Sequence, residues 1–329
     1  MHLLSNDTDL ISSLIIFVTI IVFTMRIFVT GSTGFVGTGV VKQLLSAGHE
    51  VLGLTRSDKG VEQLKSQGAE ALYGTIEDLD LLKKAASECD GVIHLAFVHN
   101  FADFEGSCVT DRAAISALGS ALAAAGGNRP LVVTSGTMLM SHGKLAHEDD
   151  APNMTSALGA ARGASEPVCL DFAKQGVRAS VVRLPPTVHG PGSSGFAGFL
   201  ATMALQKGTS AYVGEGANHW CAVHRDDAAT LYRLAVEKAT AGSVFHAVAE
   251  EAVQMKDIAT AIGEQLDLPV VNIKAEEAEA QFGWFQFGVL ADNMASSKKT
   301  REQLGWNPTS PTIIEDSPVI ANFAKSQSG

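Results

Sequence analysis

Three glycines in the motif Thr-Gly-x-x-Gly-x-x-Gly, which begins at Thr30, are the residues whose spacing most clearly indicates chemistry. The motif directly follows a β-branched apolar run and directly precedes a helical pattern. In such a loop one glycine makes the tight turn, a second lets the backbone approach a pyrophosphate, and the third lets helix and strand pack closely. The helix N-terminus then faces the phosphate charge. The predicted dinucleotide contacts are Gly31, Thr33, Gly34, Phe35, Val36 and Gly37.

The end of the next strand-like run indicates which dinucleotide is bound. An enzyme that prefers NAD places Asp or Glu there to hold the ribose 2′-hydroxyl, whereas this run ends in Thr55-Arg56-Ser57. Arg56 and Ser57 suit a 2′-phosphate. We therefore expect NADP as the cofactor, with NAD as the alternative, and a solvated surface arginine as the simpler explanation of Arg56.

The elements that position these residues alternate between short apolar runs and helical patterns from Met25 onward, which is typical of βαβ units and a parallel sheet. The strand-like runs are continuous, as expected for strands covered on both faces. They are Ile27–Thr30, Glu50–Thr55, Ala71–Tyr73, Gly91–Ala96, Leu131–Thr134 and Arg178–Leu184. Helices are predicted at Phe35–Ala47, at Asp78–Ala86 with Asp78 as its N-cap, and at Asp111–Ala125.

The predicted fold class is therefore α/β, with a Rossmann-type doubly wound parallel sheet. We expect a dinucleotide-binding domain over residues 25–184. Residues 185–329, which begin with Gly/Pro/Ser-rich loops, should mainly form a smaller substrate-binding portion, with some segments returning to the first domain.

Composition excludes several classes of protein. The chain has 329 residues, 46% of them hydrophobic, and a formal net charge of −11, so it can bury a core and should not attract a nucleic-acid backbone. Its four cysteines lie far apart and form neither a disulfide framework nor a metal-binding motif. These features indicate a cytoplasmic protein that acts on a small molecule; a homodimer is left open.

Residues 1–24 do not fit this scheme. The uncharged apolar run at 10–25 is short for a membrane span, and no Lys or Arg precedes it as in a secretory signal. We expect an extension that the fold does not need, with a short membrane anchor as the alternative.

From Met25 to about Trp306 the chain resembles the extended short-chain dehydrogenase/reductase superfamily, which includes nucleotide-sugar epimerases and dehydratases. The resemblance rests on the glycine motif, Val92-Ile-His-Leu-Ala96, Thr134-Ser-Gly-Thr137, Arg183-Leu-Pro-Pro186, Gly190-Pro191, Val223-His-Arg-Asp-Asp-Ala-Ala229 and Leu304-Gly-Trp-Asn-Pro308. It implies the Rossmann fold and further cofactor contacts at Leu95, Ala96 and Pro185.

The chain departs from this superfamily at its working centre, Tyr-x-x-x-Lys. The corresponding helix has Leu158 at the Tyr position and Arg162 at the Lys position, with Glu166 four residues later. A leucine cannot donate a proton, and neither can an arginine at neutral pH. We expect Arg162 to hold the cofactor ribose or a substrate oxyanion, or else to form a simple helix ion pair with Glu166.

The missing proton donor has several candidate replacements. They are the hydroxyls of Ser135 and Thr137, a nearby histidine, or an ordered water molecule. His94, His189 and His224 lie in superfamily motifs, although a structural histidine is the more common case for each. The predicted catalytic residues are therefore Arg162, Thr137 and Ser135.

A second departure concerns the substrate. The relatives use an Arg to clamp a diphosphate, and the resemblance places Trp220 at that position, where an aromatic plane replaces a phosphate-binding cation. Together with the aromatic run at 282–287, this favours a fairly apolar ketone or secondary alcohol over a nucleotide sugar. An NADP-dependent oxidoreductase is the leading hypothesis; an epimerase or dehydratase and a non-catalytic NADP-binding sensor or scaffold are the alternatives.

Overall fold

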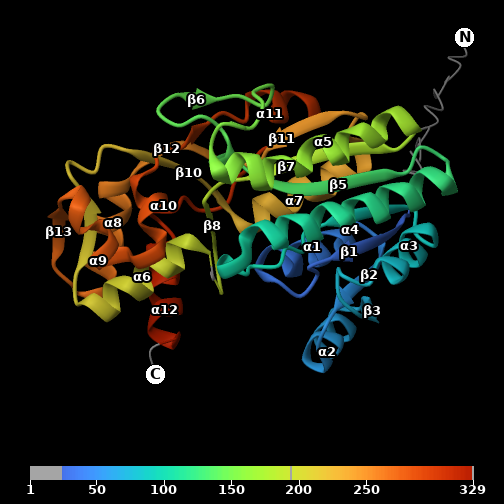
Figure 1. Cartoon of the computed structure of the whole chain (residues 1–329). Helices are drawn as coiled ribbons and strands as arrows, with labels where there is room; N and C mark the ends of the chain where they lie inside the picture. The colour runs from blue at the N-terminus through green and yellow to red at the C-terminus, as the bar shows by residue number, and fades with distance from the viewer. Residues whose placement is uncertain (1–23, 193–194, 328–329) are drawn as a thin grey trace, which may run out of the picture.

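The computed structural model describes residues 24–192 and 195–327, and a parallel sheet forms its centre (Figure 1). The sheet contains β1 (Arg26–Thr30), β2 (Glu50–Thr55), β3 (Glu70–Tyr73), β4 (Gly91–His94), β5 (Pro130–Gly136), β7 (Arg178–Leu184) and β11 (Ser243–His246). Their spatial order is β11-β7-β5-β4-β1-β2-β3. The strand order reverses between β1 and β4, and parallel sheets of this kind bind ligands at the carboxyl ends of the strands beside that reversal. The predicted α/β fold class is confirmed.

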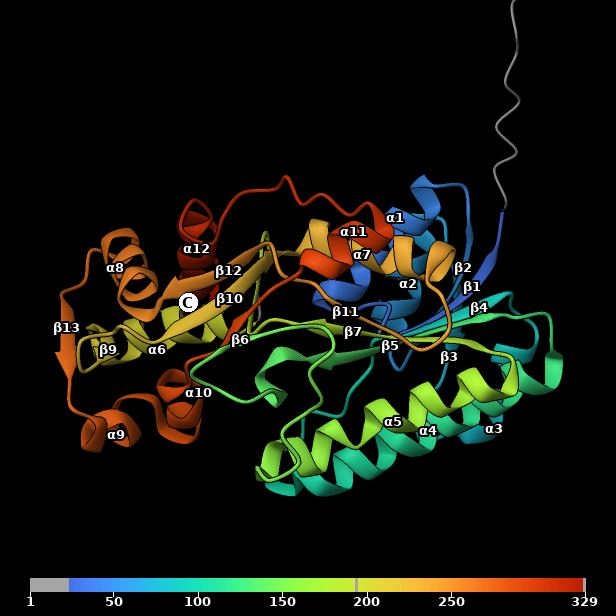
Figure 2. The ribbon, with the colours of Figure 1, turned by 90° about the horizontal axis from the view of Figure 1, so that it is seen from above.

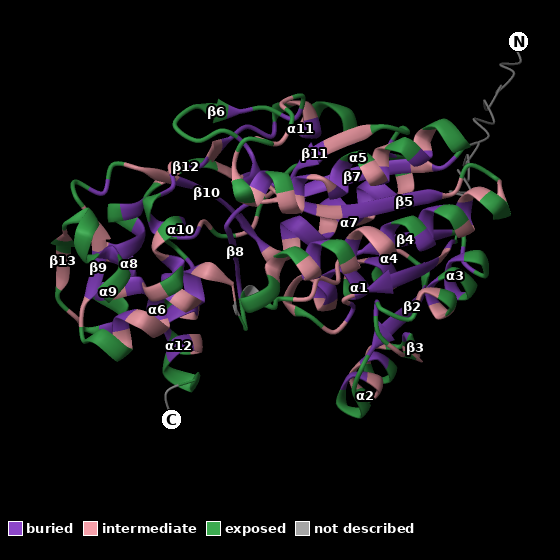
Figure 3. Ribbon diagram, in the orientation of Figure 1, coloured by how far each residue is buried: buried purple, intermediate pink, exposed green. Residues whose placement is uncertain are grey.

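Helices cover both faces of the sheet because each strand is apolar on both sides. Ile27 and Val29 pack into one core with α1 (Phe35–Ser46), α2 (Asp58–Gln67) and α7 (Arg225–Lys238). Phe28, between them, points into a second core with α3 (Leu79–Ser87), α4 (Phe104–Ala125) and α5 (Ser165–Leu170). Figure 2 shows the two groups of helices on opposite faces, and Figure 3 shows that the central strands are almost wholly buried.

A smaller unit at the side of the sheet has its own apolar core. One sheet of it contains β8 (Thr187–His189), β10 (His219–His224) and β12 (Glu250–Gln254), and two short pairs join β9 (Ser210–Val213) to β13 (Val270–Ile273) and β6 (Leu145–Ala146) to β14 (Met294–Ala295). Its helices are α6 (Phe196–Lys207), α8 (Met255–Leu266), α9 (Ala278–Phe282), α10 (Gln286–Leu290) and α12 (Ser317–Gln327). The remaining helix, α11 (Lys298–Leu304), packs against α7 and β11.

Segments after residue 184 return to the large sheet. The chain leaves it after β7, comes back for α7 and β11, and comes back again for α11. Because α7 supplies much of one core, including Leu231, Tyr232 and Ala235, the large unit is built from discontinuous parts of the sequence.

Within the described part of the chain, no helix is both long enough and apolar enough to cross a membrane. The apolar run at 10–25, expected to be an extension or a short anchor, lies outside the described residues except for its last two positions.

Candidate active site

The glycine loop after β1 has the backbone shape that a pyrophosphate needs. Gly31 has φ +68°, and a Cβ there would lie 2.8 Å from the Ala96 nitrogen. A Cβ on Gly37 would lie 2.0 Å from the Gly31 oxygen, so only glycine allows α1 to start this close to the loop. Gly34 caps α1 without a side-chain hydrogen bond, and the first turn has no acidic residue. The residues therefore fit a dinucleotide, whose phosphates would meet the amides of this helix end.

The other predicted cofactor contacts lie at the ends of neighbouring strands. Arg56 and Ser57 are exposed directly after β2, and the Ser57 hydroxyl accepts a hydrogen bond from the Gly60 amide as the N-cap of α2. After β4, the amide of Ala96 donates to the Thr30 hydroxyl at 3.2 Å, which ties the segment that contains Leu95 to the loop. Pro185 is buried directly after β7.

Arg162 lies on a π-helical turn, Gly159–Gly163, which Ala164 joins to α5. The turn packs closely on the segment before it: a Cβ on Gly159 would lie 2.1 Å from the Asn153 oxygen. Arg112 of α4 supports it by donating to the Ala161 carbonyl at 2.8 Å. Single π turns inside helices are frequent at functional sites.

The Arg162 side chain is held by three different groups. Its Nη1 donates to Asp111 Oδ2 at 2.5 Å and its Nη2 to the Thr134 carbonyl at 2.7 Å. The guanidinium carbon lies 4.7 Å from the centre of the Phe97 ring, within range of a cation–π interaction. The side chain is 12% exposed and Asp111 is fully buried. Arg162 is therefore a positioned cation whose charge is largely balanced by Asp111.

A buried polar chain connects this ion pair to the glycine loop. Thr30 Oγ1 lies 2.7 Å from His94 Nδ1, and His94 Nε2 lies 3.4 Å from Asp111 Oδ1. Ser165 donates to the other Asp111 oxygen at 2.7 Å. Burial alone would raise the pKa of Asp111, but His94, Arg162 and Ser165 together lower it. Asp111 is therefore an anion that joins three elements at the carboxyl edge of the sheet.

No tyrosine hydroxyl occupies the site. Leu158 packs against an apolar cluster that includes Leu139 and Cys221. Tyr232 of α7 lies nearby, with its hydroxyl 2.8 Å from the Thr134 hydroxyl, but its side chain is fully buried and burial raises its pKa. It is thus a structural tyrosine that a substrate does not reach.

The hydroxyls predicted to act in catalysis are both buried and hydrogen-bonded. Ser135 donates to Glu166 Oε1 at 2.6 Å. Thr137 donates to Asn293 Oδ1 at 2.7 Å, and Asn293 returns a bond to the Thr137 carbonyl at 3.0 Å. These contacts tie the end of β5 to α5 and to the segment before β14.

The helix ion pair considered for Arg162 and Glu166 is wrong. Glu166 binds Arg183 of β7 through two hydrogen bonds, of 2.9 and 2.7 Å, and Arg183 Nη1 lies 3.2 Å from His246 Nε2. The wider π turn carries Arg162 away from the face of Glu166, and each residue finds a buried partner on another element.

Among the histidines of the superfamily motifs, only His94 belongs to the chain of groups around Arg162. His189 Nδ1 lies 2.8 Å from Asp316, and His224 Nε2 lies 3.6 Å from the same carboxylate. Both imidazoles therefore join β8 and β10 to the residue before α12, as the structural explanation predicted.

Trp220 does not offer an aromatic plane to a substrate, which corrects the role expected for it. The indole is fully buried, donates to the Gly288 carbonyl at 3.1 Å and packs edge-to-face on Phe285. Within the aromatic run, Phe285 is buried as well, whereas Trp284 and Phe287 are about half exposed. Position 220 thus lacks a cation for phosphate, but its ring belongs to the core.

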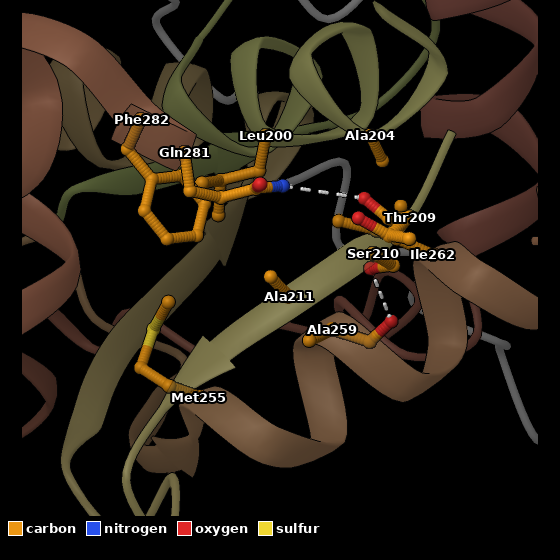
Figure 4. Close-up of a pocket in the computed structure, with 10 residues that line it drawn as sticks. All are labelled: Leu200, Ala204, Thr209, Ser210, Ala211, Met255, Ala259, Ile262, Gln281 and Phe282. Carbon is orange, nitrogen blue, oxygen red and sulfur yellow. Dashed lines mark hydrogen bonds between the residues drawn. The ribbon is translucent and has the colours of Figure 1, made fainter. Parts of the chain in front are cut away.

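The enclosed cavity of the smaller unit is not the active site. It lies between α6, α8, α9 and β9, and Leu200, Met255 and Phe282 point into it (Figure 4). Its volume of about 10 Å³ is close to the minimum for a single water molecule. A groove of about 530 Å³ runs along β11, α5 and α11, and no residue of the glycine loop lines it.

Three residues around Arg162 were not predicted from the sequence: Phe97, His99 and Asp111. The imidazole of His99 and the Phe97 ring form a T-shaped contact with their centres 5.3 Å apart, and Arg162 packs over the same phenyl ring. The available signal was the position of Phe97 and His99 directly after the predicted strand that ends at Ala96. Asp111 was included only as the start of a helix, and nothing in its spacing indicated a partner 51 residues later.

The fold and the glycine loop together define a Rossmann-type dinucleotide-binding protein. The model of the "NAD dependent epimerase/dehydratase family" matches residues 27–248. The chain belongs to this family, within the extended short-chain dehydrogenase/reductase superfamily.

Relatives of similar length occur in two yeasts. An uncharacterized protein of Schizosaccharomyces pombe is 49% identical over 303 residues, which cover 91% of this chain and 100% of the relative. An uncharacterized protein of Saccharomyces cerevisiae is 43% identical over 302 residues, covering 91% of this chain and 99% of the relative.

Solved structures share the fold at low identity. A UDP-glucose 4-epimerase of Thermotoga maritima with UDP-glucose has a TM-score of 0.75 at 21% identity, covering 93% of this chain and 100% of its own. A dTDP-glucose 4,6-dehydratase of Streptomyces venezuelae with NAD bound has a TM-score of 0.74 at 18% identity, covering 92% of this chain and 97% of its own. The family description names NAD-dependent epimerases and dehydratases, and the dehydratase structure has NAD bound.

Proposed function

We propose that the chain is an NADP-dependent oxidoreductase of the extended short-chain type that acts on a fairly apolar ketone or secondary alcohol. The observation that carries the proposal is Arg162, held by Asp111 and the Thr134 carbonyl against the face of Phe97. The site thus combines an apolar ring with a fixed cation, which suits a carbonyl oxygen on an apolar substrate.

The bound nicotinamide would accept or return a hydride, and this chain's residues would hold the cofactor at several points. The glycine loop and the amides of α1 suit the pyrophosphate, and Arg56 suits a 2′-phosphate. The indole at position 220, in place of a clamping cation, argues against a nucleotide diphosphate substrate.

Leu158 favours a second candidate, a cofactor-binding sensor without chemistry, because this side chain cannot donate a proton. The two candidates differ in one measurable respect: both bind NADPH, and only the enzyme consumes it.

The deciding experiment incubates the purified chain with NADPH and a panel of acetophenone, 2-octanone and cyclohexanone while nicotinamide absorbance is followed. Oxidation of NADPH with any of these ketones supports the enzyme. Binding without oxidation, with the ligand-free protein as the thermal-shift reference, supports the sensor.

Cofactor preference gives the first prediction. NADPH should bind more tightly than NADH, because Arg56 lies exposed at the end of β2 where an acidic residue would hold a 2′-hydroxyl. Arg56→Asp should abolish or reverse the preference in a fluorescence titration. Lys59→Asp, a matched charge change at an exposed position nearby on α2, should retain it. Equal affinities of the unaltered chain for the two cofactors would contradict the assignment.

A further inference from the structure

The segment between β4 and α4 brings a titratable side chain to the proposed reaction site. His99 and Arg162 come from different elements and both pack on the ring of Phe97, with a centroid distance of 5.3 Å for His99 and a guanidinium distance of 4.7 Å for Arg162. Phe97 follows Ala96, whose amide is bonded to Thr30 at the base of the glycine loop. His99 therefore lies at the same strand edge as the predicted cofactor contacts.

The proposed reaction needs a group that exchanges a proton with the substrate oxygen, and the other nearby side chains do not meet this need. Leu158 has no proton to give, and an arginine stays charged at neutral pH. Ser135, Thr137 and Tyr232 are buried and bonded to partners inside the protein. The imidazole of His94 is buried as well, with its Nδ1 2.7 Å from the Thr30 hydroxyl and its Nε2 3.4 Å from Asp111 Oδ1. His99 is exposed at the protein surface, so its imidazole can exchange a proton with water.

The surroundings of His99 also suit proton exchange. Neighbouring atoms reduce the hydration of the imidazole and thereby lower its pKa, and the charge of Arg162 lowers it further; a hydrogen bond with the backbone of Phe97 acts in the opposite direction. The imidazole is therefore mainly neutral at pH 7 and ready to accept a proton.

We propose that His99 takes the place of the absent tyrosine and exchanges the proton of the substrate oxygen, an assignment that rests on the proposed oxidoreductase function. When a secondary alcohol is oxidised, its carbon loses a hydride to the cofactor and its O–H bond breaks. The hydroxyl proton passes to the imidazole, the carbonyl forms, and the imidazolium releases its proton to water. Ketone reduction runs the same steps in reverse, with Arg162 beside the oxygen.

The first test needs no substrate. The chain with ¹⁵N-labelled histidine is titrated by NMR with and without NADP⁺, and His99→Gln identifies the resonances. We expect the His99 imidazole to titrate below its ordinary value of about 6.5 and to shift when NADP⁺ binds. Resonances of His99 that stay unchanged while thermal shift shows bound cofactor would overturn the proposal. A chain that does not bind NADP⁺ would instead contradict the proposed function.

The second test uses NADPH oxidation with whichever of the three ketones reacts. His99→Ala should lower turnover by about 10²-fold or more without changing NADPH affinity, and added imidazole should restore part of it. His147→Gln, at an exposed histidine near β6, is the matched control and should retain activity. Turnover of His99→Ala at the unaltered level, or a loss that imidazole does not restore, would overturn the role of His99.

Discussion

Arg162 shows how strongly the role of one residue depends on its partners. Without a partner, a guanidinium at the carboxyl edge of the sheet would be a strong electrostatic group. With Asp111 Oδ2 2.5 Å away, the Arg162 guanidinium is instead part of a nearly neutral pair. Removing one partner of a buried pair leaves the other charge without compensation, which is costly for folding. Substitutions here should therefore be measured for stability as well as for turnover.

Replacing Arg162 by Ala should lower turnover by about 10²-fold or more, because one preorganised electrostatic contact is lost. It should also lower the free energy of unfolding by about 3 kcal/mol, because the carboxylate of Asp111 stays buried without its cation. Urea unfolding and NADPH oxidation on the same preparations measure the two effects. The double variant Asp111→Asn/Arg162→Ala should recover part of the stability and none of the turnover. Normal turnover of Arg162→Ala would contradict the assignment of Arg162 to the active site.

Asp111→Asn should change how stability depends on pH. The pKa of Asp111 is lowered in the folded chain, so its contribution is present above the unfolded value of about 3.9 and is lost as pH falls through the lower folded value. The difference in unfolding free energy between the unaltered chain and the variant should therefore be constant near pH 6 and shrink below about pH 4. A difference that does not change over that range would mean that Asp111 is not held as an anion.

At the scale of elements, a second buried network joins three strands and a helix. Glu166 of α5 binds Ser135 of β5 and Arg183 of β7, and Arg183 lies beside His246 of β11. The other nitrogen of His246 lies 2.8 Å from the Ser296 carbonyl. The edge strand β11 is thus held in place by His246, a neutral imidazole that lies beside the Arg183 guanidinium.

His246 should make the fold sensitive to mild acid. Burial, and then the charge of Arg183, lower its pKa to about 4. Above the unfolded-chain pKa of about 6.5 the imidazole is neutral in both states, and the free energy of unfolding keeps its full value. As pH falls from there toward 4, the unfolded chain binds a proton that the folded chain does not, and the free energy of unfolding decreases. This amounts to about 3 kcal/mol across that range. In denaturant unfolding, His246→Gln should lack this decline in stability, whereas His147→Gln, at an exposed histidine, should retain it. The same decline in His246→Gln as in the unaltered chain would mean that His246 does not cause it.

Much of the large sheet could be predicted because its strands are continuous apolar runs. Strands β2 and β7 have the predicted bounds, and Asp78 caps α3 as expected, accepting from the Leu81 amide at 3.0 Å. Helix α2 was missed because it is short and mostly polar, and α4 starts earlier than its alanine-rich part indicated.

The site was less predictable than the sheet because its contacts join distant segments. The spacing of Arg162 and Glu166 indicated a pair on one helix, and the π turn breaks that geometry. The contacts of Arg162 with Asp111, Thr134 and Phe97 arise only when two strand ends, α4 and the π turn meet. The glycine loop could be predicted because all its essential residues lie within one short stretch.

At the scale of the whole molecule, the apolar segment before β1 can be tested separately from the core. A chain that begins at Met25 should stay soluble and bind NADPH, since β1 starts at Arg26 and Met25 is already buried in the first core. Size-exclusion chromatography and a cofactor titration measure both properties. Aggregation of the shortened chain, together with membrane association of the full one, would support the anchor.

The repeated passage of the chain between its two units restricts how the protein can open. Because the segments that contain β8, α7 with β11, α8 to α10, α11 and α12 alternate between the units, several covalent connections cross the boundary. A hinge movement over a bound substrate would have to bend all of them in concert, so large-angle closure is disfavoured relative to small local adjustments. For the same reason a protease that cuts one connection should not release either half, and a contiguous fragment that contains all of the large sheet and its helices also contains part of the smaller unit.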